Sequence, residues 1–403
     1  MSKSSRSTNA EIARKAIIEG NPNQALKVLE SAVRGGENNA EIFNLIGQCL
    51  SKVGRHKDSL GAYRKANELL PRWTEPYLGA ATSLQALGDA YAAMQALLKV
   101  LTFEPDSTRT IQQLVNLLLR LNPRSYISAL EPALVACFSH LKIDPSPLSS
   151  LCSQQLRFWL DENTGVKDSL EKQAAKLNGN QLCLLYLSRT INIDPQFEVL
   201  LTDLRRHFLL NTDIEQSPLD YLPLIVGLAK QCFLNEHVFA ADEAELKRLV
   251  LIDEHLKTEN HSLLSVYAFA LSCMYQPPKL CRNLSNFLEK LSKTYNWLGP
   301  LCELTINQPL RELEIANALP SIQPIRDTAS LQVKKQYEIN PYPRWIAPPN
   351  PPRHNFFKNV RKRFSRRVAN KTTKNLNILV AGCGTGFEPI DIARRESDAK
   401  IIA

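Results

Sequence analysis

The residues of this sequence most suited to ligand chemistry are glycines at alternate positions near its end, Gly382, Gly384 and Gly386. The apolar run 376–381 precedes them and predicts a buried β-strand. Residues 387–395 predict a helix, and residues 400–403 predict the start of a second strand. Glycine allows a sharp turn and lets the backbone lie directly against a bound group. This order of strand, loop, helix and strand is the first unit of a doubly wound nucleotide-binding sheet.

The spacing of the glycines distinguishes between two kinds of nucleotide site. A dinucleotide site requires G-x-G-x-x-G, with the pyrophosphate at the N-terminus of the helix. Here the third glycine comes one position earlier, and the loop is similar to motif I of class I methyltransferases, which bind S-adenosylmethionine. The resemblance implies that the amino-acid moiety of this cofactor contacts the loop residues Gly382, Cys383, Gly384, Thr385, Gly386 and Glu388.

Simpler interpretations of the same loop remain open. The glycines could form a tight turn in another α/β fold, with no cofactor. Cys383 is interpreted as a small residue in a crowded turn and not as a nucleophile, because no His or Lys can be assigned to activate it. The histidines show no metal-ligand spacing either, so we predict no metal site.

The sheet that such a loop requires is larger than the segment present. An acidic residue that binds the ribose hydroxyls is expected about 20 residues past the loop, and that position falls beyond Ala403. Two strands cannot bury their faces. We therefore expect residues 375–403 to be the start of an incomplete domain. We assign no catalytic residue, and we predict that the 403-residue chain has no methyltransferase activity by itself.

A 34-residue repeat occupies the first part of the chain. Gly20, Gly54 and Gly88 recur at this spacing, and each is expected to end the first helix of its unit. Pro71 and Pro105 are expected to end the second helix. Helix pairs that cannot bury a face alone must stack on one another. The pattern resembles the tetratricopeptide repeat over residues 6–123, with units near 6–39, 40–73 and 74–107 and a degenerate fourth.

Stacked repeats of this kind form a shallow concave groove. We expect the groove to hold a protein or peptide partner. Self-association, or packing against the middle of the chain, is the alternative. The polar positions that suit such a groove are Asn44, Gln48, Ser51, Gln85 and Arg109.

The rest of the chain predicts a helical domain over 124–330, followed at 331–374 by a proline-rich linker and one basic amphipathic helix. The tetrad "NPYP" at 340–343 has the wrong residue order for the N-P-P-Y loop of amino-group methyltransferases. An ordered linker that caps the domain is the simpler interpretation. Its alternative is a lid over the cofactor formed by Tyr337, Asn340 and Tyr342.

Charge and cysteine usage limit the partners and the compartment. Ten Lys or Arg and no Asp or Glu lie between Ile339 and Phe387, so the rest of a chain of net charge +9 carries −1. These charges attract phosphate, but a solvated basic face is preferred over nucleic-acid binding. The nine cysteines include no C-x-x-C pair, which favours a reducing cytoplasm over a disulfide framework. No export signal or membrane span is apparent.

The order of these parts resembles a bacterial family of tetratricopeptide-repeat-containing S-adenosylmethionine-dependent methyltransferases. The likeness also rests on the segments "CFLNEHVF" (232–239), "LRELEIANALPSI" (310–322), "QYEINPYPRW" (336–345) and "ILVAGCGTG" (378–386). It implies a mainly α fold: a repeat superhelix, a helical middle and the first βαβ unit of an incomplete Rossmann-like domain. It implies S-adenosyl-L-methionine as cofactor, but it does not supply the methyl acceptor. A non-enzymatic interaction scaffold is the alternative function.

Overall fold

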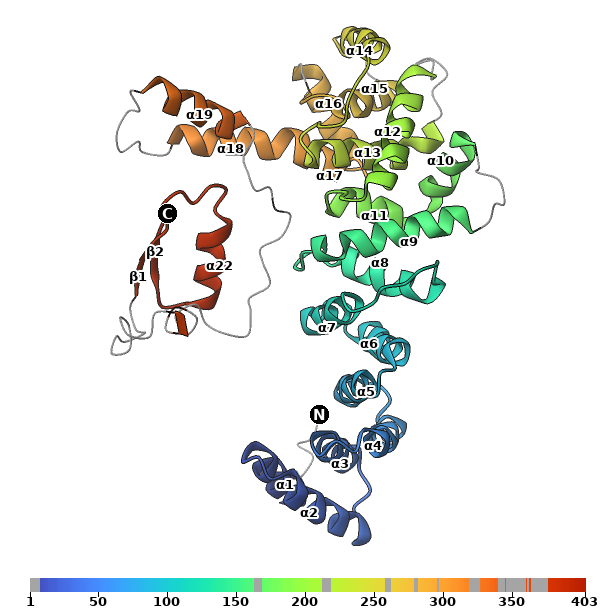
Figure 1. Ribbon diagram of the computed structural model, residues 1–403, viewed down its shortest axis with the longest axis vertical. Coiled ribbons are helices and arrows are strands. Elements are labelled where there is room, and N and C mark those ends of the chain that lie inside the picture. The colour runs from blue at the N-terminus through green and yellow to red at the C-terminus, as the bar shows by residue number, and fades with distance from the viewer. Residues whose placement is uncertain are drawn as a thin grey trace. The chain divides into compact units, whose positions relative to one another are not determined.

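The protein is mainly helical over the described residues, with one small two-stranded parallel sheet (Figure 1). This confirms the fold class at that level of detail. The chain divides into two compact units, residues 1–122 with 127–140 and residues 123–126 with 141–403. The computed structural model describes residues 8–162, 169–211, 219–257, 262–278, 282–295, 297–318, 327–339, 345, 360, 362–363 and 376–403.

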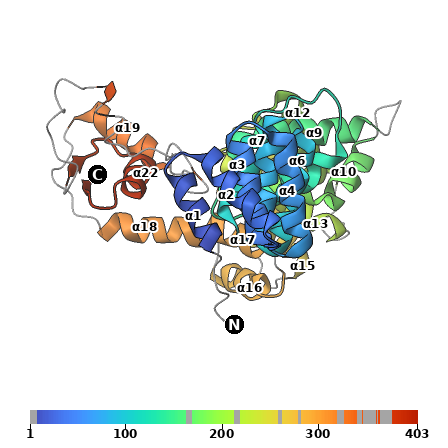
Figure 2. The same cartoon turned by 90° about the horizontal axis from the view of Figure 1, so that it is seen from below.

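The first unit is built from consecutive helices joined by short connections. Helices α1, α3 and α5 pack on one another in one layer, and each packs against the helix that follows it (Figures 1 and 2). Helix α8 packs on α6 and α7. The helices are α1 (Thr8–Ile18), α2 (Pro22–Arg34), α3 (Ala40–Lys52), α4 (His56–Leu69), α5 (Thr74–Ala86), α6 (Ala90–Phe103), α7 (Thr108–Leu118), the 3₁₀ turn η1 (Ser128–Leu130) and α8 (Glu131–Ser139).

The same turn joins the two helices within each of the first three pairs. Gly20, Gly54 and Gly88 have φ values of 82°, 83° and 82°. The N–H of each glycine donates to the carbonyl three residues earlier, over 3.1–3.3 Å. Residues with a Cβ rarely adopt this left-handed conformation, whereas glycine adopts it freely. The 34-residue spacing of the sequence is therefore also the spacing of a repeated backbone conformation.

Glycine has a different role where two helices approach closely. The ring of Tyr63 on α4 is 2 % exposed and occupies the space beside Gly47 on α3 and Gly79 on α5. A Cβ on Gly47 would lie 2.6 Å from the Tyr63 ring. This distance is shorter than any acceptable carbon contact, so the absence of a side chain allows the aromatic ring to fill the core.

Two glycine substitutions should therefore have opposite effects on stability. Gly47→Ala should lower the free energy of unfolding by about 1–3 kcal/mol, because the Tyr63 ring must move. Gly61→Ala should raise it by about 0.5–1 kcal/mol, because Gly61 is an exposed position within α4 and its Cβ would meet no atom within 4 Å. Urea denaturation of both variants measures the difference, and equal midpoints would contradict the role of Tyr63.

The second unit continues with helix pairs whose connections vary in length. Helix α11 packs between α9 and α13, and α13 packs against α15, while α12 contacts α10 and α14. Alternate helices thus form two layers. The helices are η2 (Ser146–Leu148), α9 (Ser149–Asp161), α10 (Leu170–Gly179), α11 (Gln181–Arg189), α12 (Pro195–Leu210), η4 (Leu219–Tyr221), α13 (Leu222–Leu234), α14 (Glu243–Leu256), α15 (Leu263–Cys273) and α16 (Arg282–Ser292).

The last helices of this unit are α17 (Gly299–Cys302), α18 (Gln308–Ala318) and α19 (Thr328–Ile339). A π-helical segment, η5 (Glu303–Asn307), joins α17 to α18. Helix α19 extends into the segment predicted as linker and ends two residues before Pro341, since a residue that precedes proline disfavours helical conformation. The predicted basic helix lies mostly outside the described residues, which include only 360 and 362–363 of it.

The sheet contains β1 (Asn377–Leu379) and β2 (Lys400–Ile402), which pair in parallel with Ile378 opposite Ile401. Helix α22 (Phe387–Arg395) connects them, with the same bounds as the predicted helix. On α22, Ile392 is 3 % exposed, whereas Ile390 is 38 % exposed. Ile390 therefore lies at the edge of the buried face.

Candidate functional site

The glycine loop joins the end of β1 to the start of α22. Its three glycines all have left-handed backbone conformations, with φ of 70° at Gly382, 53° at Gly384 and 84° at Gly386. Gly386 is also the N-cap residue of α22. The loop therefore lies at the carboxyl end of a parallel strand and at the amino end of a helix, where open α/β sheets bind their ligands.

Gly382 and Gly386 are required for their backbone conformation and not for close packing. A Cβ on Gly382 would meet no atom within 4 Å, and one on Gly386 would meet only Ile390 Cδ1, at 3.8 Å. The turn at these two positions is therefore open, in contrast to the crowded turn expected around Cys383. Any other residue would strain the backbone by about 1–2 kcal/mol at a left-handed position.

The remaining loop residues present polar groups near the start of α22. Cys383 is half-buried, with Sγ 3.8 Å from the Gly384 carbonyl oxygen. Glu388 is exposed in the first turn of the helix. Amides in the first turn of a helix have no carbonyl one turn earlier to bind, and they favour negative charge. A small carboxylate group suits this end of the loop.

Trp345 contacts the glycine loop from 40 residues earlier in the chain. Its indole Nε1–H donates to the Thr385 carbonyl oxygen over 3.3 Å. Its ring lies edge to face with Phe387, with centroids 6.2 Å apart and planes at 72°. Trp345 belongs to the segment 336–345 on which the family resemblance rests, but no role was predicted for it. The local sequence marked Trp345 only as one of several aromatic residues in a proline-rich segment.

Of the proposed lid residues, the described part of the chain includes Tyr337 alone. Tyr337 lies on α19 with 60 % of its side chain exposed. Asn340 and Tyr342 lie outside the described residues. Trp345, a few residues further along the chain, does contact the loop.

The five polar residues expected in the repeat groove differ in exposure. Asn44 is only 4 % exposed, and Ser51 belongs to a chain of hydroxyls in which Ser83 Oγ lies 3.1 Å from Ser51 Oγ and 2.8 Å from Ser59 Oγ. Gln48 and Gln85 are half-buried. Arg109 is exposed and forms an ion pair of 3.1 Å with Glu75. Asn44 and Ser51 thus belong in large part to the packed interior.

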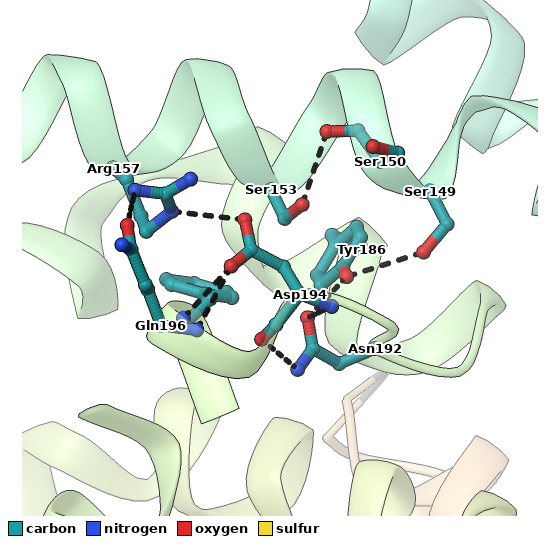
Figure 3. Close-up of polar contacts among 9 residues, drawn as sticks. Ser149, Ser150, Ser153, Arg157, Tyr186, Asn192, Asp194 and Gln196 are labelled. Atoms are coloured by element: carbon teal, nitrogen blue, oxygen red, sulfur yellow. Dashed lines mark hydrogen bonds and ion pairs between the residues drawn. The ribbon is translucent and has the colours of Figure 1, made fainter. Parts of the chain in front are cut away.

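A larger polar cluster joins α9, α11 and the start of α12 (Figure 3). The Arg157 guanidinium lies 2.9 Å from the Asp194 carboxylate, which also accepts from the Phe197 amide. Burial raises the pKa of Asp194, but these hydrogen bonds outweigh it and hold the pKa below its usual value. The Tyr186 hydroxyl donates to Asn192 Oδ1 over 2.7 Å. The cluster caps α12 and fixes the loop before it, so we assign it a structural role.

A buried charge cluster fixes the segment that follows α13. The Arg205 guanidinium is 1 % exposed and lies 3.4 Å from Glu245 Oε1. It also donates to the carbonyls of Phe239 and Ala240. The ring of Tyr275 lies 4.2 Å from the guanidinium carbon, and the Tyr275 hydroxyl donates to Glu245 over 2.7 Å. These contacts hold the end of the segment 232–239 in place.

Lys230 is a buried cation on α13. It is 8 % exposed, and its Nζ lies 3.3 Å from Ser188 Oγ on α11. Burial lowers the pKa of Lys230 from 10.5 to about 8. The Ser188 hydroxyl itself donates to the Leu184 carbonyl, so it can accept from the lysine. A cation held by a single hydroxyl is poorly compensated.

The chain matches no protein-family model and no curated protein. Within the described ranges, no three His, Cys, Asp or Glu side chains are grouped as metal ligands. The cysteines that the structure describes are all free thiols, and of these only Cys383 is not buried. No helix among the described residues is long and apolar enough to cross a membrane.

Proposed function

We propose that residues 376–403 begin the cofactor site of an S-adenosylmethionine-dependent methyltransferase. One observation carries the proposal: three left-handed glycines connect a parallel strand to the N-terminus of a helix. In this proposal the amino-acid end of the cofactor lies against the loop, with its carboxylate near the first-turn amides of α22. The geometry requires glycine at the positions that the sequence resemblance assigns to the cofactor.

The chemistry of such a site is mainly positioning. The cofactor supplies an electrophilic methyl group, which the acceptor displaces in line. The residues of this loop would hold the far end of the cofactor, so that the methyl group has a defined position. We assign no acid or base to the described residues. Helices α1–α7 are proposed to be tetratricopeptide units that recruit a protein or peptide, and the recurrent glycine turns support this.

The test is uptake of S-adenosylhomocysteine, the product that remains after methyl transfer, by the full-length protein, including any sequence that follows Ala403. Gly384→Val should weaken binding about tenfold or more, because a β-branched residue is strongly disfavoured at φ 53°. Gly61→Ala should leave binding unchanged. Isothermal titration measures both dissociation constants. Equal affinity of the Gly384→Val and unmodified proteins would refute the proposed site.

A non-enzymatic interaction scaffold is the second candidate. It is favoured by the helix pairs of the first unit, which share one turn geometry and stack in one layer order. Under this alternative, the unmodified full-length protein takes up no S-adenosylhomocysteine at millimolar concentration. The same titration therefore separates the two candidates.

A further inference from the structure

The peptide group between Thr385 and Gly386 is held from both sides. Its carbonyl oxygen accepts the indole N–H of Trp345 over 3.3 Å. Its N–H donates to the Cys383 carbonyl over 3.0 Å. A peptide group that precedes glycine can rotate at little cost, because glycine tolerates both signs of φ. With both of its polar atoms paired, this peptide group has one preferred orientation.

The ring of Trp345 adds a second constraint at the start of α22. It lies edge to face with Phe387, which directly follows the N-cap residue Gly386. Aromatic pairs of this geometry are favourable beyond the area that they bury. One side chain therefore fixes both the last peptide of the loop and the first residue of the helix.

We infer that Trp345 is a positioning residue of the glycine loop and sets its affinity for the cofactor. The effect on cofactor affinity rests on the proposed function. The effect on the conformation of the loop does not depend on any ligand. Loss of the Trp345 contacts with Thr385 and Phe387 would loosen the turn that orients the Phe387 and Glu388 amides at the start of α22. These are the groups proposed to receive the carboxylate of the cofactor.

The loop conformation can be tested without a ligand by hydrogen exchange at the Gly386 amide. In Trp345→Leu, which loses both the N–H donor and the ring, exchange should accelerate about tenfold. In Trp345→Phe, which keeps a ring beside Phe387, the acceleration should be about threefold. Trp297→Phe is the matched control, because Trp297 packs against Tyr295 elsewhere in the second unit, and it should leave the exchange rate unchanged.

The effect of Trp345 on cofactor affinity is tested by titration of the same variants with S-adenosylhomocysteine. Affinity should fall in the same order, about tenfold for Trp345→Leu and about threefold for Trp345→Phe, while the thermal transition of the helices stays unchanged. Unchanged exchange in both variants would overturn the inference. Faster exchange in a protein that binds no S-adenosylhomocysteine even when unmodified would refute the proposed function and confine Trp345 to ordering the loop.

Discussion

Arg205→Met should lower the free energy of unfolding of the second unit by about 3–5 kcal/mol. The substitution keeps a long apolar side chain but removes the guanidinium that faces the buried carboxylate of Glu245, which is 3 % exposed. It also leaves the carbonyls of Phe239 and Ala240 without this donor. Removing one partner of a buried charge cluster costs far more than removing one from the surface. Denaturant titration of the intact protein measures the loss.

The neighbouring residue Arg206 offers a matched control. Its guanidinium contacts Asp242 and Glu245, the second of which is shared with Arg205, but 45 % of its side chain is exposed. Arg206→Met should therefore cost about 1 kcal/mol or less. If the two variants lost equal stability, burial would not be the reason for the effect, and the account of the Arg205 cluster would be wrong.

Lys230→Met should have the opposite sign and stabilise the protein at pH 7. Burial lowers the pKa of Lys230 from 10.5 to about 8, and each pKa unit corresponds to 1.36 kcal/mol. The charged lysine therefore destabilises the folded state by about 3 kcal/mol below pH 8. Methionine fills a similar volume without the charge, and Ser188 keeps its own hydrogen bond to Leu184. The variant should therefore unfold at a higher denaturant concentration.

The pH dependence gives this prediction a sharper form. The unfolded chain binds the proton of Lys230 up to about pH 10.5, whereas the folded protein releases it near pH 8. The stability that Lys230→Met gains over the unmodified protein should therefore shrink as the pH increases from about 8 to 10.5, and other groups that titrate in this range cancel in the difference. Lys247, whose side chain is 75 % exposed, provides a control: Lys247→Met should differ from the unmodified protein by the same amount at every pH in this range. Parallel pH profiles for all three proteins would contradict the assignment.

Part of the fold could be predicted because its signals are local. The turns at Gly20, Gly54 and Gly88 each need a left-handed residue, and their equal spacing makes them visible in one sequence. The helix pairs of the second unit were predicted only as helices. Their connections differ in length, so no fixed spacing marks the layers that α11 and α13 share with α9 and α15.

In the candidate site, too, only the features with local sequence signals could be predicted. Strand, loop and helix at 376–395 could be predicted, because their apolar and glycine patterns lie within twenty residues. The contact from Trp345 spans 40 residues and depends on tertiary structure. Buried charges such as Arg205 and Lys230 were missed for a related reason: their residue types are ordinarily found on the surface.

The π-helical segment at Glu303–Asn307 has a consequence for the helix beyond it. A π-turn accommodates one additional residue without breaking the helix. Each residue advances an α-helix by about 100°, so removing one residue there would rotate every later side chain of α18 by that angle. The exposed apolar residues of α18, Leu310, Leu313 and Ile315, would then face another direction. A deletion of one residue in this segment would thus leave the length of α18 unchanged but alter the direction in which its side chains point.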